Sequence, residues 1–319
     1  MKTENRLFSI IILAYHSGKR VEIAYEKLKE LLEFEKIPFE FIIINDGSND
    51  GDETRDVSRL LEENNDEVHY FELSRNYTSH YAAFAGLSVC AGGCSTIIPD
   101  DEQQPYDTLV KAYRLWESGE KIVLPVRSGR DDPKISKFWS NSFYWFLNKT
   151  TDFKYPPYGL DTWFIDREIV DIINNKISPL NTTTITEILR LGYDPKLLFY
   201  ERRKSLNSKS RWTFRKKLKL ASDWFFTTSK FPIKLVTVLG VFSFFLTMAM
   251  ICFYLYIKIW GNQSYWSTDK VPGWVSLVVI ISFFSGMILL SLAMISEYIW
   301  RIFDEVKRRP GYIIKRRIL

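Results

Sequence analysis

Two long stretches without a charged side chain constrain this chain more than any other feature of its sequence. They run from Leu235 to Ile257 and from Val271 to Ser296. A helix needs about 20 apolar residues to cross a bilayer. Because lipid offers no hydrogen-bond partners, the backbone of such a segment must be satisfied internally, as it is in a helix. We therefore predict two transmembrane helices, at residues 233–258 and 273–299.

The charges around these stretches predict their orientation. The connector from Lys258 to Lys270 carries two lysines and one aspartate. The outer flanks are more basic and carry Lys216, Lys217, Lys219, Lys230, Lys234, Arg301, Lys307, Arg308, Arg309, Lys315, Arg316 and Arg317. Since basic residues concentrate on the cytoplasmic side, we expect both ends in the cytoplasm and the loop at residues 259–272 outside. Residues 201–232 are expected to form a basic interfacial segment attracted to anionic lipid, and residues 300–319 a basic cytoplasmic tail.

The overall composition indicates which kind of partner the protein contacts. The net charge is +5, and the basic side chains gather beside the apolar stretches, which favours a membrane surface and argues against nucleic acid. Cys90, Cys94 and Cys252 supply neither a disulfide framework nor a zinc ligand set, and we interpret them as packing residues. The polar residues Met1 to Arg6 lack the apolar core of a secretory signal, so the N-terminal part is expected to stay in the cytoplasm.

Residues 1–200 alternate between patterns typical of strands and of helices. Leu7 to Leu13 is an apolar run typical of a strand buried on both faces, and Val21 to Phe34 carries apolar side chains at helical spacing. Further strands are expected at Phe39–Ile44, His69–Leu73, around Thr96, at Lys121–Val126, early in Trp163–Ile172 and at Leu197–Tyr200, and helices at Arg55–Glu63, Ser79–Val89, Tyr106–Trp116 and Ile135–Asn148. This alternation predicts an α/β fold with right-handed crossovers and one mostly parallel sheet.

Polar side chains follow three of the expected strands. Asp46 stands in Asn-Asp-Gly-Ser, Arg75 follows the third strand, and Thr96 to Pro105 reads Thr-Ile-Ile-Pro-Asp-Asp-Glu-Gln-Gln-Pro. Open α/β sheets bind ligands at the carboxyl ends of their strands, and clustered carboxylates there suit a hard divalent cation with substrate phosphates. Taken singly, each sequence is also typical of a solvated turn. Their occurrence on three strand ends favours a nucleotide-diphosphate pocket.

These residues carry a resemblance to a known family. The matching features are Tyr15, the sequence Asn-Asp-Gly-Ser-x-Asp at Asn45–Asp50, Ser74-Arg75-Asn76 with Ala82, Ala83 and Gly86, Asp101-x-Gln103-x-Pro105, Tyr158-Gly159-x-Asp161, Ser208–Trp212 and the tail from Ser296 to Tyr312. In order and spacing they resemble family 2 glycosyltransferases of the GT-A fold. The branch that they resemble is the polyprenyl-phosphate glycosyltransferases, which include dolichyl-phosphate mannose synthase and bacterial undecaprenyl-phosphate sugar synthases. The resemblance implies that residues 1–200 form a GT-A catalytic domain.

The resemblance also implies a donor and metal site. It places the donor nucleotide against Tyr15, Asp46 and Arg75, beside Asp100 and Asp101, and assigns Mg²⁺ or Mn²⁺ to Asp101 and Gln103. Such an ion would neutralise the leaving diphosphate. One departure concerns the usual Asp-x-Asp, which has Pro99 in its first position. Asp100 therefore either substitutes for the missing carboxylate or has no metal role.

Asp161 resembles the family's aspartate beside the sugar and the acceptor. A lipid phosphate is already anionic and hardly needs a general base, so Asp161 is expected to orient that acceptor; a hydroxyl acceptor would make it a base, and a strand-end cap is the structural alternative. The candidates for holding the acceptor phosphate and the diphosphate are Arg127, Arg130, Lys137, Arg203, Ser210 and Arg211. Each could equally belong to a solvated basic surface. The usual Arg-x-x-Gly-x-Ser has Ser205 and Ser208 at its Arg and Gly positions.

The resemblance implies an inverting, membrane-anchored enzyme that moves a sugar from a nucleotide diphosphate, with UDP favoured, to polyprenyl (undecaprenyl) phosphate. It would act at the cytoplasmic leaflet of a bacterial inner membrane, in cell-surface glycan synthesis. Members of the branch can form tetramers, so a homo-oligomer is a further expectation. Two alternatives remain: a family 2 enzyme that glycosylates a hydroxyl of a lipid-linked or surface glycan, and a binding or scaffold subunit without catalysis.

Overall fold

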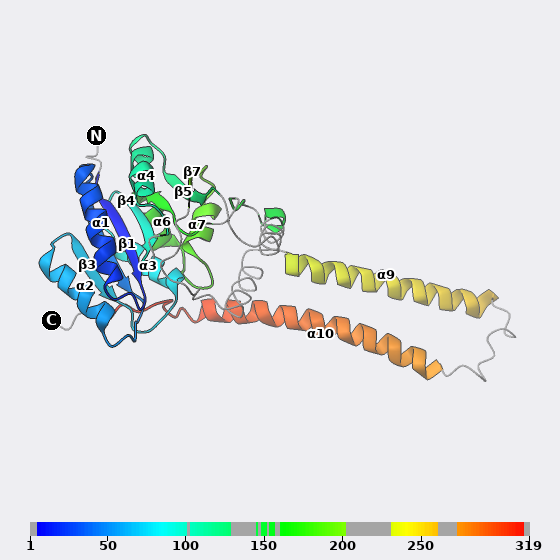
Figure 1. Ribbon diagram of the computed structural model, residues 1–319. Coiled ribbons are helices and arrows are strands. Elements are labelled where there is room, and N and C mark those ends of the chain that lie inside the picture. Colours follow the sequence, from blue (N-terminus) through cyan, green and yellow to red (C-terminus); the bar gives the residue numbers. More distant parts are fainter. Residues whose placement is uncertain are drawn as a thin grey trace. The chain divides into compact units, whose positions relative to one another are not determined.

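The computed structural model describes residues 5–100, 103–128, 145, 148–151, 153–156, 160–201, 231–260 and 273–315. The chain divides into two compact units (Figure 1). The first comprises Met1–Leu218 together with Arg309–Leu319, and the second comprises Lys219–Arg308. The first unit contains the candidate functional site, and the second contains two long helices.

In the described part of the first unit, seven strands form one sheet in the order β3-β2-β1-β4-β6-β5-β7. The strands are β1 (Phe8–Ala14), β2 (Phe39–Asn45), β3 (Val68–Glu72), β4 (Cys94–Pro99), β5 (Ile122–Arg127), β6 (Phe164–Asp166) and β7 (Lys196–Tyr200). All pairings are parallel except those of β6, which runs antiparallel to both β4 and β5. The predicted α/β fold with a mostly parallel sheet is therefore confirmed.

Helices cover both faces of this sheet. They are α1 (Arg20–Phe34), α2 (Glu53–Asn64), α3 (Ser79–Val89), α4 (Asp107–Glu117), α6 (Arg167–Lys176) and α7 (Thr184–Arg190). Alternate residues of β1 serve the two faces: Ile10 and Ile12 pack in a core cluster with Leu28 of α1, whereas Ile11 lies against α3. A Cβ added to Gly86 would lie 2.4 Å from Ile11 Cγ2, so a glycine allows α3 to approach the sheet closely.

The predicted elements agree with the structure within a few residues, and two features were not predicted. The strand expected early in Trp163–Ile172 is present as β6, but its antiparallel direction was not predicted, because direction depends on how the chain connects neighbouring strands and not on apolar periodicity. Helix α7, with seven residues, was not predicted; its N-cap is Thr183, whose hydroxyl accepts a hydrogen bond from Thr186 N at 3.2 Å. Most of the predicted helix Ile135–Asn148 lies outside the described residues. Cys90 and Cys94 are buried, as expected of packing residues, whereas Cys252 is exposed.

The second unit contains α9 (Phe231–Trp260), which covers the charge-free stretch Leu235–Ile257, and α10 (Gly273–Val306), which covers the described residues of the second stretch from Gly273 to Ser296. Among its described residues, one segment is long and apolar enough to cross a membrane: Phe283–Val306, with a mean hydropathy of 1.5. Ile233–Ser243 is a shorter apolar helical segment. Two helices are thus present where two spans were predicted, and one of them meets the criterion for a span.

Candidate active site

Four parallel strands end in register, which gathers the predicted donor residues at one edge of the sheet. Ala14 of β1 is opposite Asn45 of β2, Asn45 is opposite Glu72 of β3, and Leu13 of β1 is opposite Pro99 of β4. The residues that follow these strand ends are Tyr15, Asp46, Leu73 and Asp100. Arg127 closes β5 at the same edge. This is the carboxyl edge, at which open α/β sheets bind ligands.

The turn after β2 brings Asp46 against the segment that carries Arg75. Gly47 has φ of +60°, and a Cβ there would lie 2.3 Å from the carbonyl carbon of Arg75. Only glycine therefore fits between the two turns. The turn is closed by Asn45, whose Oδ1 accepts hydrogen bonds from Ser48 N at 3.0 Å and Ser48 Oγ at 2.7 Å.

Asp46 itself is buried, with 4% of its surface exposed. Its Oδ1 accepts a hydrogen bond from Tyr77 N at 2.7 Å. Burial raises the pKa of Asp46 to about 6, against backbone hydrogen bonds from Tyr77 and Thr78 that favour the carboxylate. Asp46 therefore fixes the Arg75 segment, and its pKa lies well above that of an ordinary aspartate.

Arg75 is exposed and lies over an aromatic ring of its own segment. Its guanidinium carbon is 4.7 Å from the centre of the Tyr77 ring, a cation–π contact that restricts a long side chain. The Tyr77 hydroxyl is 3.0 Å from Ser74 Oγ. An exposed guanidinium held in this way at the sheet edge is suited to bind a diphosphate.

The turn that carries Tyr15 is held by Thr54, the second residue of α2. The fully buried Thr54 Oγ1 accepts hydrogen bonds from Ser17 N at 2.8 Å and Gly18 N at 2.9 Å. Its hydroxyl donates to the carboxylate of Asp50. The last aspartate of the Asn-Asp-Gly-Ser-x-Asp sequence thus acts through Thr54 on the turn beside Tyr15, whose ring packs at 4.2 Å from the ring of His16.

Asp100 is engaged within the protein. It is buried, and its Oδ2 accepts hydrogen bonds from Arg20 Nε at 3.0 Å and Arg20 Nη2 at 2.7 Å. Both donors bond the same oxygen, and the ion pair compensates the burial of the charge. Asp100 therefore anchors the β4 end to the start of α1.

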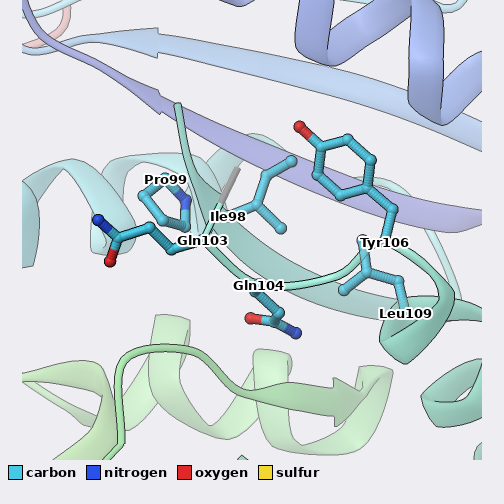
Figure 2. A pocket seen from close by; sticks show the side chains of 6 residues that line it. All are labelled: Ile98, Pro99, Gln103, Gln104, Tyr106 and Leu109. Carbon is cyan, nitrogen blue, oxygen red and sulfur yellow. The ribbon is translucent and has the colours of Figure 1, made fainter. Parts of the chain in front are cut away.

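The end of β4 and the described residues that follow it line a small cavity of about 10 Å³, with Ile98, Pro99, Gln103, Gln104, Tyr106 and Leu109 around it (Figure 2). Figure 2 shows Gln103 beside the ring of Pro99, and Gln104 below the loop. The buried Gln104 Oε1 accepts a hydrogen bond from Thr162 Oγ1 at 2.7 Å. Because Thr162 follows Asp161, this bond ties the predicted metal loop to the predicted acceptor residue.

Arg127 and Asp161, which are far apart in sequence, form an ion pair. The Arg127 side chain is 9% exposed and that of Asp161 is 46% exposed. The segment that carries Asp161 is fixed by Thr96 Oγ1, which donates a hydrogen bond to Trp163 O at 2.6 Å. The structure thus brings a buried guanidinium and a half-exposed carboxylate together at the sheet edge.

Several predicted site residues lie outside the described part of the chain. They are Asp101, Arg130, Lys137, Arg203, Ser210 and Arg211. Among the described residues, no group of three or more His, Cys, Asp or Glu could hold a metal ion. The oxygen donors of the loop after β4, a carboxylate at Asp101 and an amide at Gln103, are the chemistry that Mg²⁺ and Mn²⁺ prefer.

The sequence patterns missed the residues that hold this site in place. Arg20, Thr54, Gln104 and Thr162 contact the predicted site residues or their turns. Arg20 and Asp100 are 80 positions apart, so no local spacing indicates their pairing. The only signal for Thr54 was its position at the start of a helix four residues after a motif aspartate.

Comparisons with known proteins identify the family of this chain. The sequence profile of glycosyl transferase family 2 matches residues 9–171. The uncharacterized glycosyltransferase YkcC of Bacillus subtilis is 30% identical over 97% of this chain and 93% of its own length. The prophage-derived bactoprenol glucosyl transferase of Shigella flexneri is 29% identical over 97% of both chains.

A solved structure, the mannosyltransferase PcManGT of Pyrobaculum calidifontis with GDP-Man and Mn²⁺, is a more distant match. Its identity is 15% over 95% of this chain and 88% of that chain, with a TM-score of 0.46. From the family profile and the full-length relative, the chain belongs to glycosyl transferase family 2 and is a glycosyltransferase.

Proposed function

We propose that this enzyme transfers a sugar, with inversion, from a nucleotide diphosphate to a polyprenyl phosphate at the cytoplasmic leaflet of a bacterial inner membrane. The observation that carries the proposal is the carboxyl edge of the sheet. There Asp46, Arg75 and Gln103 follow the ends of β2, β3 and β4, and the Arg127–Asp161 pair lies at the end of β5. The full-length similarity to bactoprenol glucosyl transferases supports the choice of acceptor.

In the proposed complex, Tyr15, Asp46 and Arg75 bind the nucleotide. Asp46 accepts a hydrogen bond from the base or ribose, and Arg75 contacts the diphosphate. A bound Mg²⁺ or Mn²⁺ at Asp101 and Gln103 would supply positive charge for the leaving diphosphate. Asp100, which is engaged by Arg20, would hold the end of β4 in place without serving as a metal ligand.

The Arg127–Asp161 pair favours a phosphate acceptor over a hydroxyl acceptor. Asp161 is already engaged by a guanidinium, which suits a carboxylate that orients its surroundings more than one that takes up a proton. Arg127 is proposed to contact the acceptor phosphate, with Arg130, Lys137, Arg203, Ser210 and Arg211 as further candidates. An acceptor that is already ionised needs no general base.

The membrane arrangement is proposed to consist of two spans. Helix α10 contains one segment of sufficient length and hydropathy, and α9 covers the charge-free stretch Leu235–Ile257. With both helices inserted, residues 1–200 and the tail would lie in the cytoplasm and the connector outside. A polyprenyl phosphate in the inner leaflet would then reach the same side as the catalytic domain.

The direct test is a product assay with purified full-length enzyme in detergent. Undecaprenyl phosphate, Mg²⁺ or Mn²⁺ and a panel of UDP- and GDP-sugars are supplied, and lipid-linked sugar is detected by mass spectrometry. One donor is expected to give a lipid-linked monosaccharide that disappears with a chelator. Elongation of a glycan acceptor with no lipid product for any donor would contradict the phosphate acceptor and favour the hydroxyl alternative.

A further inference from the structure

Arg309–Leu319, which follow α10, belong to the first compact unit. Gly311–Lys315, which we call the C-terminal strap, pairs with the end of β3 through an antiparallel bridge between Leu73 and Ile314. Ser74 N donates to Ile313 O at 2.9 Å, and Lys315 N donates to Glu72 O at 2.8 Å. The strap thus supplies two backbone hydrogen bonds to the last residues before Arg75.

This pairing covers an edge of the sheet. β3 is the terminal strand in the sheet order, and an uncovered terminal strand presents unpaired N–H and C=O groups. The opposite side of the same segment is paired with β2, since Leu73 N donates to Asn45 O at 2.9 Å. Residues 73–74 are therefore bonded from both sides.

A buried carboxylate adds a charged contact between the strap and β3. Glu72 is 7% exposed and accepts hydrogen bonds at 2.9 Å from Nε and Nη2 of Arg55. Lys315 Nζ bonds the same carboxylate. Burial favours protonation of Glu72, but the hydrogen bonds from Arg55 and Lys315 outweigh it and hold its pKa below the ordinary range.

The strap has a second attachment on α3. Tyr312 Oη donates to Phe84 O at 3.4 Å. A Cβ on Gly311 would lie 2.8 Å from Cε1 of Tyr81 and 3.0 Å from Cγ of Pro179. Gly311 therefore packs so closely that any larger residue would push the strap from this surface.

The strap bonds Ser74, which directly precedes Arg75 of the candidate donor site. Ser74 Oγ lies 3.0 Å from the Tyr77 hydroxyl. Tyr77 N donates a hydrogen bond to Asp46 Oδ1, and the guanidinium of Arg75 lies over the Tyr77 ring. We propose that the C-terminal strap is a positioning element for donor binding, which holds the Arg75 segment in the conformation that receives the nucleotide diphosphate. This inference rests on the proposed function of Arg75.

The test compares substitutions in the full-length enzyme. Lys315→Pro removes the N–H that bonds Glu72 O together with the charge, and Lys315→Gln removes the charge alone. Lys307→Gln is the matched control, because it makes the same charge change outside the strap. Steady-state kinetics are expected to show a donor KM raised about tenfold for Lys315→Pro and less for Lys315→Gln, with kcat and acceptor KM within about twofold of wild type. Lys315→Arg is expected to restore the donor KM.

Hydrogen exchange gives an independent measurement. The amides of Ser74 and Tyr77 are expected to lose protection in Lys315→Pro, while the rest of the sheet keeps it. If Lys315→Pro does not fold, Gly311→Val displaces the strap at its other attachment and is expected to raise the donor KM in the same way.

The outcomes separate this inference from the proposed function. A wild-type enzyme that shows no calorimetric binding of UDP or GDP with Mg²⁺ or Mn²⁺ would refute the donor site itself. If wild type binds the nucleotide and the strap variants bind it equally well, the strap has no positioning role. Equal increases in donor and acceptor KM, or a fall in kcat alone, would likewise overturn it, because neither is specific to the donor.

Discussion

Among single residues, Asp46 is expected to make nucleotide binding depend on pH. Its buried carboxyl has a pKa of about 6, so it changes charge just below neutral pH. A proton on Asp46 would remove an acceptor that the base or ribose is proposed to use. The folded-state pKa lies above the ordinary value, so the protonated form is populated at higher pH than in a free aspartate.

We expect donor affinity to rise as the pH increases through about 6. Calorimetric titration of the nucleotide between pH 5 and pH 7.5 measures this. The terminal phosphate of the nucleotide also titrates in this range, so Asp46→Asn, which cannot ionise, is the control. A pH dependence that is identical in wild type and Asp46→Asn would exclude Asp46 as its source.

The Arg127–Asp161 pair yields a second expectation at this scale. If the two residues act as one unit, Arg127→Gln and Asp161→Asn should each lower kcat/KM for the acceptor, and the double variant should lose less than the sum. Coupling of about 0.5–3 kcal/mol is typical of residues in contact. Lys111→Gln, which removes an exposed charge 2.8 Å from Asp107, should leave kcat/KM unchanged. Additive losses would contradict joint action.

At the scale of elements, the start of α2 determines the shape of the turn beside Tyr15. Thr54 is completely buried and accepts two backbone N–H bonds from that turn. The sheet edge and the helix start are therefore joined through one hydroxyl. A side chain of the same shape without the hydroxyl would leave both donors without an acceptor.

Thr54→Val is expected to lower the free energy of unfolding by about 1–3 kcal/mol, since buried donors that lose their partner cost this much, and to weaken donor binding. Thermal unfolding and calorimetry measure the two effects. Ser58→Ala is the matched control, because Ser58 is equally buried one turn later and donates only to Thr54 O at 2.7 Å. Thr54→Ser should recover both properties. Donor affinity that is normal in Thr54→Val would remove the turn from the binding site.

The parallel core of the sheet was predictable from sequence because its strands are continuous apolar runs that end in polar residues. Ala14, Asn45 and Glu72 end in register, so residues placed after strands meet at one edge. The pairings of Arg20 with Asp100 and of Gln104 with Thr162 were not predictable. They depend on how distant segments approach, which no spacing along the chain encodes.

At the scale of the whole molecule, the C-terminal residues illustrate the same limit. Their basic composition indicated a membrane-proximal tail, yet Ile314 pairs with Leu73 and Lys315 bonds Glu72. A segment of five residues that completes a sheet edge has no periodicity of its own. Arg309–Leu319 therefore belong to the same compact unit as Met1–Leu218.

The proposed two-span topology has a direct test by cysteine labelling in whole cells. Ser264→Cys lies in the connector and Lys307→Cys follows α10. With two spans, a membrane-impermeant maleimide should label Ser264→Cys in intact cells and Lys307→Cys only after permeabilisation. A single span formed by α10 would reverse this pattern.

Inverting transfer of a sugar to a lipid phosphate forms a bond between the anomeric carbon and a phosphate oxygen, and this bond can be observed in the product. Nuclear magnetic resonance of the purified lipid product shows whether the anomeric carbon couples to phosphorus and which anomer is present. We expect a sugar joined through its anomeric carbon to the polyprenyl phosphate, with the configuration opposite to that of the donor. A glycosidic bond to a hydroxyl, or a retained configuration, would contradict the claim.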